Sequence, residues 1–217
     1  MSGAVELWLV RHGETAWSLS GAHTSTTDIP LTEHGRQRAV ELRDYLKGKK
    51  FAAVFVSPMQ RARETCEIAG YGDVMQVEPG LMEWNYGEAE GKTTPEMRKK
   101  YGADWSVWSS PIVGGEAVEH VGERADAVIE KALAAAANPT HDGGAVMNGA
   151  PAVSDGPQAV ALFAHAQILR ILAARWIGLP AVGGRLFALG TGSVSVLGFE
   201  REQRVVAKWN RGFEDGE

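Results

Sequence analysis

Short, strongly apolar runs alternate with segments of helical spacing along this chain of 217 residues. The runs "VELWLV" (5–10) and "FAAVFVS" (51–57) are typical of buried parallel strands, which are apolar on both faces. The segments "PLTEHGRQRAVELRDYLKG" (30–48), in which Thr32 is the expected N-cap, and "MQRARETCEIAG" (59–70) predict helices. This order of strand, helix, strand and helix favours parallel pairing with right-handed crossovers.

The second half of the chain continues the alternation. A helical excursion is expected over 95–110, followed by a long amphipathic helix over 116–137. The apolar run "AVALFAH" (159–165) then predicts another buried strand, and the segment directly after it, 166–180, predicts a helix. Two strand-like segments near the end, "SVSVLGFE" and "RVVAKWN", are separated by a short polar turn and indicate a closing hairpin.

These elements predict one α/β domain over 1–217, because the length suits one well-filled domain and is short for two. The expected fold is a three-layer α/β/α sandwich with a mainly parallel central sheet and an antiparallel edge hairpin. The segment 138–158 is rich in Gly, Pro, Asp and Asn, which predicts a flexible surface loop inside the domain.

Composition narrows the class of protein. A formal net charge of −5 argues against nucleic acid or a membrane surface as a partner, because such binding needs a basic face. No apolar run is long enough to cross a bilayer, and "MSGAVELW" lacks the basic flank and apolar core of a secretory signal. The single cysteine, Cys66, fits a reducing compartment. We therefore expect a cytoplasmic protein.

Chargeable side chains stand where predicted strands or apolar patches end. Arg11 and His12 follow the first strand, and His165 ends the strand "AVALFAH". Arg61 follows the second strand, and Glu83 follows the apolar patch in "PGLMEW". The ligand crevice of a doubly wound sheet lies beyond the carboxyl ends of its strands, so we expect these five side chains to meet there.

Such a group of side chains suits phosphoryl chemistry. Arginine forks match a tetrahedral dianion with paired N–H donors and leave little need for a metal. A neutral imidazole is a competent nucleophile at phosphorus, which predicts two in-line steps through a phosphohistidine. A carboxylic acid with a raised pKa supplies the leaving alkoxide with a proton and later activates water, and Glu83 is the candidate.

Four ordered segments, "LVRHGET" (9–15), "SPMQRARET" (57–65), "LMEWNYGEAEG" (81–91) and "FAHAQILR" (163–170), together resemble the histidine phosphatase superfamily in its phosphoglycerate-mutase-like branch. By this resemblance His12 is the phosphorylated nucleophile and Glu83 the proton donor. Arg11, Arg61 and His165 line the phosphate pocket. The positions where family members contact substrate correspond to Ser18, Thr24, Ser25, Tyr86 and Ala166.

Departures from the family pattern favour hydrolysis over mutase activity. Ser18 replaces the usual asparagine, and Ala166 replaces a glycine after the second histidine. True mutases have an arginine pair in the middle segment that grips the substrate carboxylate, and a basic stretch after the glutamate; this chain has "EWNY" and "MRKKYG" instead. The expected activity is cofactor-free, metal-independent hydrolysis of small phosphorylated metabolites, with sugar phosphates or bisphosphates favoured.

The sequence is compatible with several alternative functions. The chain could be a cofactor-dependent phosphoglycerate mutase or, in another class, a non-catalytic phospho-ligand-binding protein, and it could form a homodimer. Glu88 or Glu90, close to Glu83, could be the proton donor instead. His23 lies in the loop over the expected pocket, whereas Trp105 and Trp108 are expected to pack the excursion onto the core.

Other phosphate chemistries fit the sequence poorly. The stretch "GEAEGKTT" is one residue short of a nucleotide-binding P-loop, and Tyr86 stands where the first glycine belongs. No arginine loop follows Cys66, so a cysteine phosphatase is not expected. The chain has no GxSxG elbow and no spacing of histidines and carboxylates that indicates a metal site.

Overall fold

A computed structural model describes residues 5–138 and 158–212. Six strands form one sheet in the order β3-β2-β4-β1-β5-β6. The neighbouring pairs β2·β3, β2·β4 and β1·β4 are parallel, and β1·β5 and β5·β6 are antiparallel. The strands are β1 (Val5–Arg11), β2 (Ala53–Val56), β3 (Met75–Val77), β4 (Gln158–Ala164), β5 (Val194–Glu200) and β6 (Gln203–Arg211).

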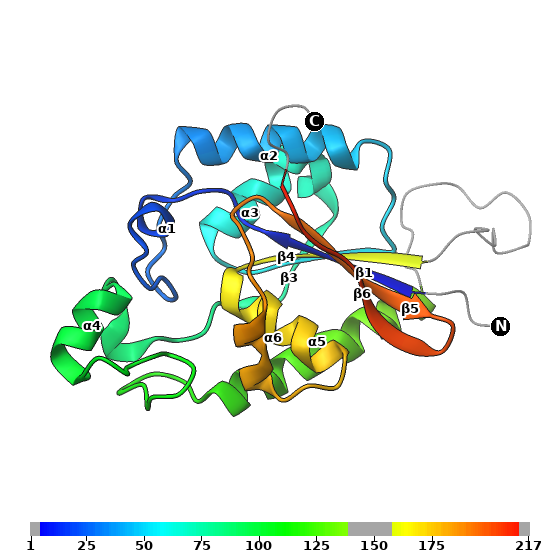
Figure 1. Ribbon diagram of the computed structural model, residues 1–217. Helices are drawn as coiled ribbons and strands as arrows, with labels where there is room; N and C mark the ends of the chain where they lie inside the picture. Colours follow the sequence, from blue (N-terminus) through cyan, green and yellow to red (C-terminus); the bar gives the residue numbers. More distant parts are fainter. Residues whose placement is uncertain (1–4, 139–157, 213–217) are drawn as a thin grey trace, which may run out of the picture.

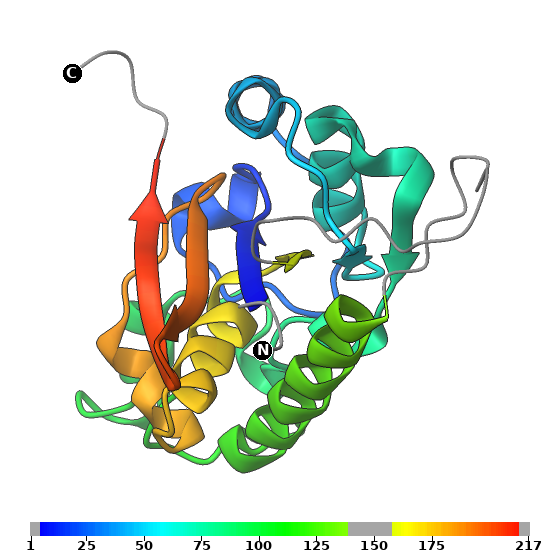
Figure 2. The ribbon, with the colours of Figure 1, turned by 90° about the vertical axis from the view of Figure 1, so that its right-hand side faces the viewer.

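Helices cover both faces of the sheet, as Figure 1 and the turned view in Figure 2 show: α2 and α3 lie on one face, and α5 and α6 on the other. The α-helices are α1 (Ala16–Ser20), α2 (Glu33–Leu46), α3 (Gln60–Cys66), α4 (Thr94–Tyr101), α5 (Val118–Ala137) and α6 (Ala166–Trp176). Shorter helical turns span Glu67–Tyr71, Gly72–Val74, Pro79–Leu81, Gly87–Ala89 and Ala181–Leu186. The α/β/α layers and the edge hairpin predicted from sequence are confirmed.

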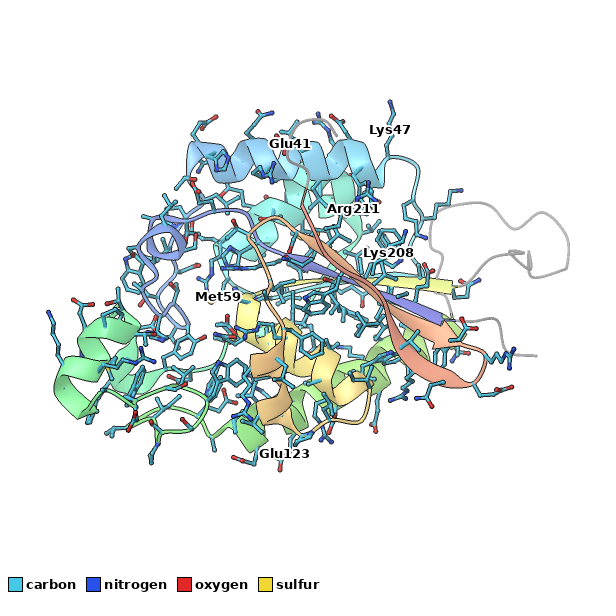
Figure 3. All side chains as sticks on the ribbon, in the orientation of Figure 1. Glu41, Lys47, Met59, Glu123, Lys208 and Arg211 are labelled. Atoms are coloured by element: carbon cyan, nitrogen blue, oxygen red, sulfur yellow. The ribbon has the colours of Figure 1, made fainter. Side chains whose placement is uncertain are left out.

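Side chains sort between the layers and solvent as the helical spacing predicts. Glu41 on α2 and Lys47 directly after it point away from the sheet, and Glu123 on α5 does the same on the opposite side (Figure 3). Two apolar clusters fill the spaces between the sheet and the helices. Phe163 lies in the cluster under α2 and α3, while Trp84 and Trp176 lie in the larger cluster with α5 and α6. The site is therefore built on a sheet that is buried on both faces.

The strand register aligns the ends of three neighbouring strands. Arg11 pairs with Ala164 across β1 and β4, and Val56 pairs with Phe163 across β2 and β4. β1 and β4 end together, so His12 and His165 follow side by side, while β2 ends one residue earlier and Ser57 reaches the same carboxyl edge. Parallel pairing is the cause, because it brings equivalent strand ends to one edge.

The loop after β1 is held by a close approach of two glycines. A Cβ on Gly13 would lie 2.4 Å from the carbonyl oxygen of Gly35, and a Cβ on Gly35 would lie 2.3 Å from the carbonyl oxygen of Glu14. Gly35 lies in the first turn of α2, whose N-cap is Thr32 as predicted; the Thr32 side chain accepts from the Gly35 N–H. The bare backbone at Gly13 and Gly35 thus lets the start of α2 rest against the residues after His12.

Three local features differ from the sequence expectations. The helical excursion expected over 95–110 is an α-helix only over α4 (Thr94–Tyr101), and turns follow it. The short strand β3 was not predicted, since "MQV" is half-exposed and lies at the sheet edge. Glu83 does not follow a strand but lies in an irregular segment after the turn Pro79–Leu81. Most of the predicted loop 138–158 falls outside the described residues: Asn138 caps the end of α5, and Gln158 already begins β4.

Candidate active site

A cavity of about 240 Å³ opens at the carboxyl edge of the parallel strands. The elements that contribute to it, α1 and the beginnings of α4 and α6, lie toward one end of the sheet in Figure 1. The residues that line the cavity are Arg11, His12, Thr15, Trp17, Ser18, Gly21, Ala22, His23, Thr24, Glu83, Tyr86, Thr94, Ala166 and Gln167. A cavity of this size accommodates a small molecule rather than a polymer.

The His12 ring has a defined tautomer. Its Nδ1 lies 2.6 Å from the carbonyl oxygen of Gly13, which can only accept, so Nδ1 carries the proton and Nε2 keeps its lone pair. Burial and the positive charges of Arg11 and Arg61 hold the pKa of His12 well below its ordinary value. The ring is therefore neutral at physiological pH, with Nε2 available as a nucleophile or base.

Arg11 brings a positive charge to the same wall of the cavity. Its Nη1 donates to the carbonyl oxygen of Leu189, while its Nε is buried and has no hydrogen-bond partner among the described residues. Burial lowers the pKa of Arg11, and the Glu83 carboxylate partly opposes this shift. Because Arg11 lines the cavity together with His12, its positive charge is placed to attract an anion bound there.

Arg61 and His165 form a buried layer behind His12 and are not among the lining residues. The Arg61 Nε donates to Nδ1 of His165 over 3.1 Å, so the His165 proton is on Nε2, which lies 2.7 Å from the Ser57 hydroxyl. The Nη1 and Nη2 groups of Arg61 donate to the carbonyl oxygens of Thr27 and Ser25, both over 3.1 Å. Burial and the charge of Arg61 hold the pKa of His165 well below its ordinary value.

Glu83 is held on the N-terminus of α6. Its Oε1 accepts from the backbone N–H groups of Trp84 and Ile168, and its Oε2 accepts from that of Gln167, all at 3.0 Å. A helix N-terminus favours a carboxyl group because its first N–H donors have no partner within the helix. Oε2 has one N–H donor and so retains a second acceptor position from which a proton can be exchanged in the cavity.

The two neighbouring carboxylates are engaged elsewhere. Glu88 is exposed and accepts from Lys100 and Tyr101, each over 2.6 Å. Glu90 accepts from the backbone N–H groups of Ser25 and Thr27 and therefore organises the loop after α1. Of the three carboxylates proposed as proton donors, Glu83 is the one that lines the cavity.

The residues predicted to contact substrate divide into two groups. Ser18, Thr24, Tyr86 and Ala166 lie on the cavity wall. The Ser18 hydroxyl already accepts from Thr15 N–H in a capping box at α1, and Thr24 donates to the Ala22 carbonyl.

Ser25 is placed differently. It is buried, does not line the cavity and donates its hydroxyl to Glu90. The expectation that Ser25 lies where substrate is contacted therefore does not fit this arrangement, because its side chain is bonded to Glu90 inside the loop.

His23 occupies the outer part of the cavity. Its Nδ1 lies 2.6 Å from the carbonyl oxygen of Lys92, so Nε2 carries the lone pair. The ring packs edge-on against Tyr86 and Trp105, with centroid separations of 5.0 and 5.7 Å. Trp105 is buried, and the half-buried Trp108 packs against the same apolar cluster, as predicted.

Sequence reasoning missed six residues of the cavity wall, and two of them, Gly21 and Ala22, lie in the loop between Ser18 and His23. Thr15 and Trp17 lie within or just after the first recognised segment, and Gln167 follows Ala166, so proximity to those segments was the available signal. Thr94 had no such signal. It reaches the wall because the loop over 22–23 pairs with the segment 90–93 just before α4, a contact between distant parts of the chain.

Residues 7–212 match the model of the histidine phosphatase superfamily (branch 1), and the chain belongs to this family. The fold agrees with that class. Within the ranges 5–138 and 158–212, no three His, Cys, Asp or Glu side chains gather as a metal site, and no helix has the length and hydropathy of a bilayer span.

The chain is similar to particular members of the family. It is 36% identical over 204 residues to an acid phosphatase of Mycobacterium tuberculosis, covering 93% of this chain and 90% of that one. It is 31% identical over 193 residues to sedoheptulose 1,7-bisphosphatase of Saccharomyces cerevisiae, covering 79% and 67%. A solved Mycobacterium tuberculosis structure superposes with a TM-score of 0.81 at 33% identity, covering 96% and 98%.

Proposed function

We propose that this chain is a phosphomonoesterase that hydrolyses small phosphorylated metabolites through a phosphohistidine at His12. The observation that carries the proposal is the His12 tautomer: Nδ1–H is bonded to the Gly13 carbonyl, so the lone pair on Nε2 is available in the cavity. The kinship with an acid phosphatase and a sugar bisphosphatase supports the same reaction class.

In the first step, Nε2 of His12 forms a bond to phosphorus while the bond from phosphorus to the ester oxygen breaks. Glu83 protonates the leaving alkoxide from Oε2. Arg11, which lines the cavity, stabilises the charge on the phosphoryl oxygens, and Arg61 adds positive charge from behind.

In the second step, the ionised Glu83 takes a proton from water, whose oxygen attacks phosphorus. The bond between phosphorus and Nε2 breaks, inorganic phosphate leaves, and both side chains return to their initial state. The imidazole needs no proton change in either step, which agrees with a His12 ring that is kept neutral.

The cavity wall supports hydrolysis of a polyol or sugar phosphate over mutase activity. Arg11 is the single Lys or Arg among the residues that line the cavity. The basic residues of "MRKKYG" are directed elsewhere: Arg98 donates to the Trp105 carbonyl, and Lys100 pairs with Glu88. A substrate carboxylate would lack a cation, whereas Ser18, Thr24, Thr94 and Gln167 offer polar groups suited to hydroxyls.

A panel of phosphorylated metabolites, with phosphate release as the readout, tests the activity. We expect turnover of sugar and polyol phosphates, none of it sensitive to EDTA, and no conversion of 3-phosphoglycerate to 2-phosphoglycerate. A stable complex with these compounds but no turnover, even of p-nitrophenyl phosphate, would identify a non-catalytic phospho-ligand-binding protein instead.

Labelled phosphate tests the intermediate. Protein quenched during turnover of a ³²P-labelled substrate is expected to retain phosphate that is lost in acid and kept in alkali, as a phosphohistidine behaves. His12→Ala abolishes both labelling and turnover, whereas the matched variant His34→Ala, at an exposed histidine of α2, retains both. Turnover by His12→Ala would disprove the proposed nucleophile.

A further inference from the structure

Glu83, the general acid in the proposed function, lies in a segment that does not pair with any strand of the sheet. Glu83 follows the helical turn Pro79–Leu81, and the residues from Met82 to Tyr86 belong to neither a helix nor a strand. A carboxyl group that must reach a leaving oxygen within hydrogen-bond distance requires a backbone placed to a fraction of an ångström. The backbone on both sides of Glu83 must therefore be held by other contacts.

Arg124, on α5, holds the residues before Glu83. Its Nη1 donates to the carbonyl oxygens of Gly80 and Met82, over 2.7 and 3.0 Å. Its Nε and Nη2 donate to the two carboxylate oxygens of Glu116, over 2.8 and 2.9 Å. One rigid guanidinium thus joins the peptide bond directly before Glu83 to a paired carboxylate.

Glu116 holds the residues after Glu83. Its backbone N–H donates to the Asn85 carbonyl over 3.0 Å, and its own carbonyl accepts from the Trp84 indole over 2.7 Å. Its Oε2 also accepts from the Asn85 N–H over 3.4 Å. Burial acts to raise the pKa of Glu116, but the hydrogen bonds and charge of Arg124 outweigh it and lower that pKa, so the carboxylate stays ionised at neutral pH.

Arg124 and Glu116 do not line the cavity that contains His12. They line a second cavity of about 410 Å³, and Glu83 is the one residue that lines both. Glu83 therefore forms part of the boundary between the two cavities, with the ion pair on the side away from the nucleophile. The hydrogen bonds of the pair reach the catalytic residues through the segment that carries Glu83, and the charge of Arg124 acts in addition on His165.

We propose that the Arg124–Glu116 ion pair is the positioning element for Glu83: by bonding the main chain on both sides, it aims the carboxyl group at the leaving oxygen. Arg124 and Glu116 are positioning residues, since neither touches the reacting atoms. The inference rests on the proposed function, in which Glu83 is the general acid. It predicts that loss of the pair harms proton transfer more than phosphate binding.

The test compares kcat/KM of Arg124→Met for phosphate monoesters with good and poor leaving groups. Misplacing the acid is expected to reduce turnover of an alkyl phosphate about 10- to 100-fold, a part of the roughly 100- to 10,000-fold that general acid catalysis supplies. Turnover of p-nitrophenyl phosphate, whose leaving group needs no proton, should fall less than about threefold. KM should change little for either ester.

Arg175→Met is the matched control, because Arg175 of α6 also forms a two-pronged pair, with Asp126 of α5, over 2.9 and 2.8 Å. Any change in kcat/KM of Arg175→Met should be the same for esters with good and poor leaving groups. Arg124→Lys keeps the charge but loses the fork, so an intermediate loss confined to alkyl esters is expected. Adding Glu83→Gln to Arg124→Met should cause little further loss. Equal losses for both esters in Arg124→Met and Arg124→Lys would overturn the inference.

The role of Glu83 as general acid and the positioning role of Arg124 can be disproved separately. If Glu83→Gln itself shows no dependence on the leaving group, the role of Glu83 in the proposed function is wrong, and with it the positioning role. If Glu83→Gln shows the dependence and both Arg124 variants do not, the positioning role alone is wrong. Circular dichroism and thermal unfolding of each variant identify a variant that fails to fold. If Arg124→Met does not fold, the comparison of the two esters is made with Arg124→Lys.

Discussion

The imidazole rings of His12 and His165 lie edge to face, with centroids 5.1 Å apart and planes inclined by 60°. They meet because each follows the last paired residue of two adjacent parallel strands, Arg11 opposite Ala164. Two charged rings at this separation, next to Arg61, would repel one another, and burial adds to that penalty. The arrangement therefore favours two neutral imidazoles.

Neutral histidines predict activity at acid pH. Because the pKa of His12 lies well below its ordinary value of about 6.5, protonation does not remove the nucleophile as the pH falls through that value. The rate of phosphoenzyme formation under single-turnover conditions should therefore show no break near pH 6.5 once substrate ionisation is taken into account. A loss of tenfold per pH unit below 6.5 would contradict a neutral, low-pKa His12.

The lowered pKa values of His12 and His165 predict that the folded protein is less stable in acid. Below a pH of about 6.5 the unfolded chain takes up protons at His12 and His165, whereas the folded protein does not. The free energy of unfolding should accordingly decrease as the pH falls from 7 to 5, as urea titrations can measure. His165→Gln should show a shallower decrease, since one such group is removed.

Replacement of Glu83 separates proton donation from phosphate transfer. Glu83→Gln cannot donate a proton, so we expect alkyl phosphate turnover to fall about 100-fold and p-nitrophenyl phosphate turnover to fall far less. Steady-state kcat and KM for the two esters provide the measurement. Glu88→Gln, at the exposed neighbour paired with Lys100, is the control and should leave both esters unchanged.

Arg61 is predicted to support structure and activity together. Its side chain is fully buried and donates to His165 and to the carbonyl oxygens of Ser25 and Thr27. Arg61→Ala leaves these acceptors without a donor and should lower the free energy of unfolding by about 3 kcal/mol. Arg63→Ala, on the exposed side of α3, should change it by less than about 0.5 kcal/mol.

His23 is predicted to act in substrate selection. Its lone pair on Nε2 can accept from a substrate hydroxyl, because Nδ1 is occupied by the Lys92 carbonyl. His23→Phe removes that acceptor while keeping a ring against Tyr86, so KM for a sugar phosphate should rise about fivefold, the loss of one hydrogen bond. KM for p-nitrophenyl phosphate should not change, since it has no hydroxyl to bind. An equal rise in KM for the sugar phosphate and for p-nitrophenyl phosphate would show that His23 acts only by packing.

The elements of the fold follow from local patterns. Apolar runs buried on both faces and helix-patterned segments identified β1, β2, β4 and the long helices, because strand and helix periodicity is written in neighbouring residues. The strand-end positions of Arg11, His12 and His165 came from the same signal. The short strand β3 escaped it, since three half-exposed residues at an edge show no such pattern.

The sequence by itself thus determined the layered sheet and which polar residues stand at its carboxyl edge. Only the tertiary structure decided that Arg61 and His165 lie behind His12, that Ser25 is bonded to Glu90, and that the Arg124–Glu116 pair surrounds the segment carrying Glu83. These relations join side chains from distant segments. Their geometry depends on the strand register and helix packing, and no spacing within one segment encodes it.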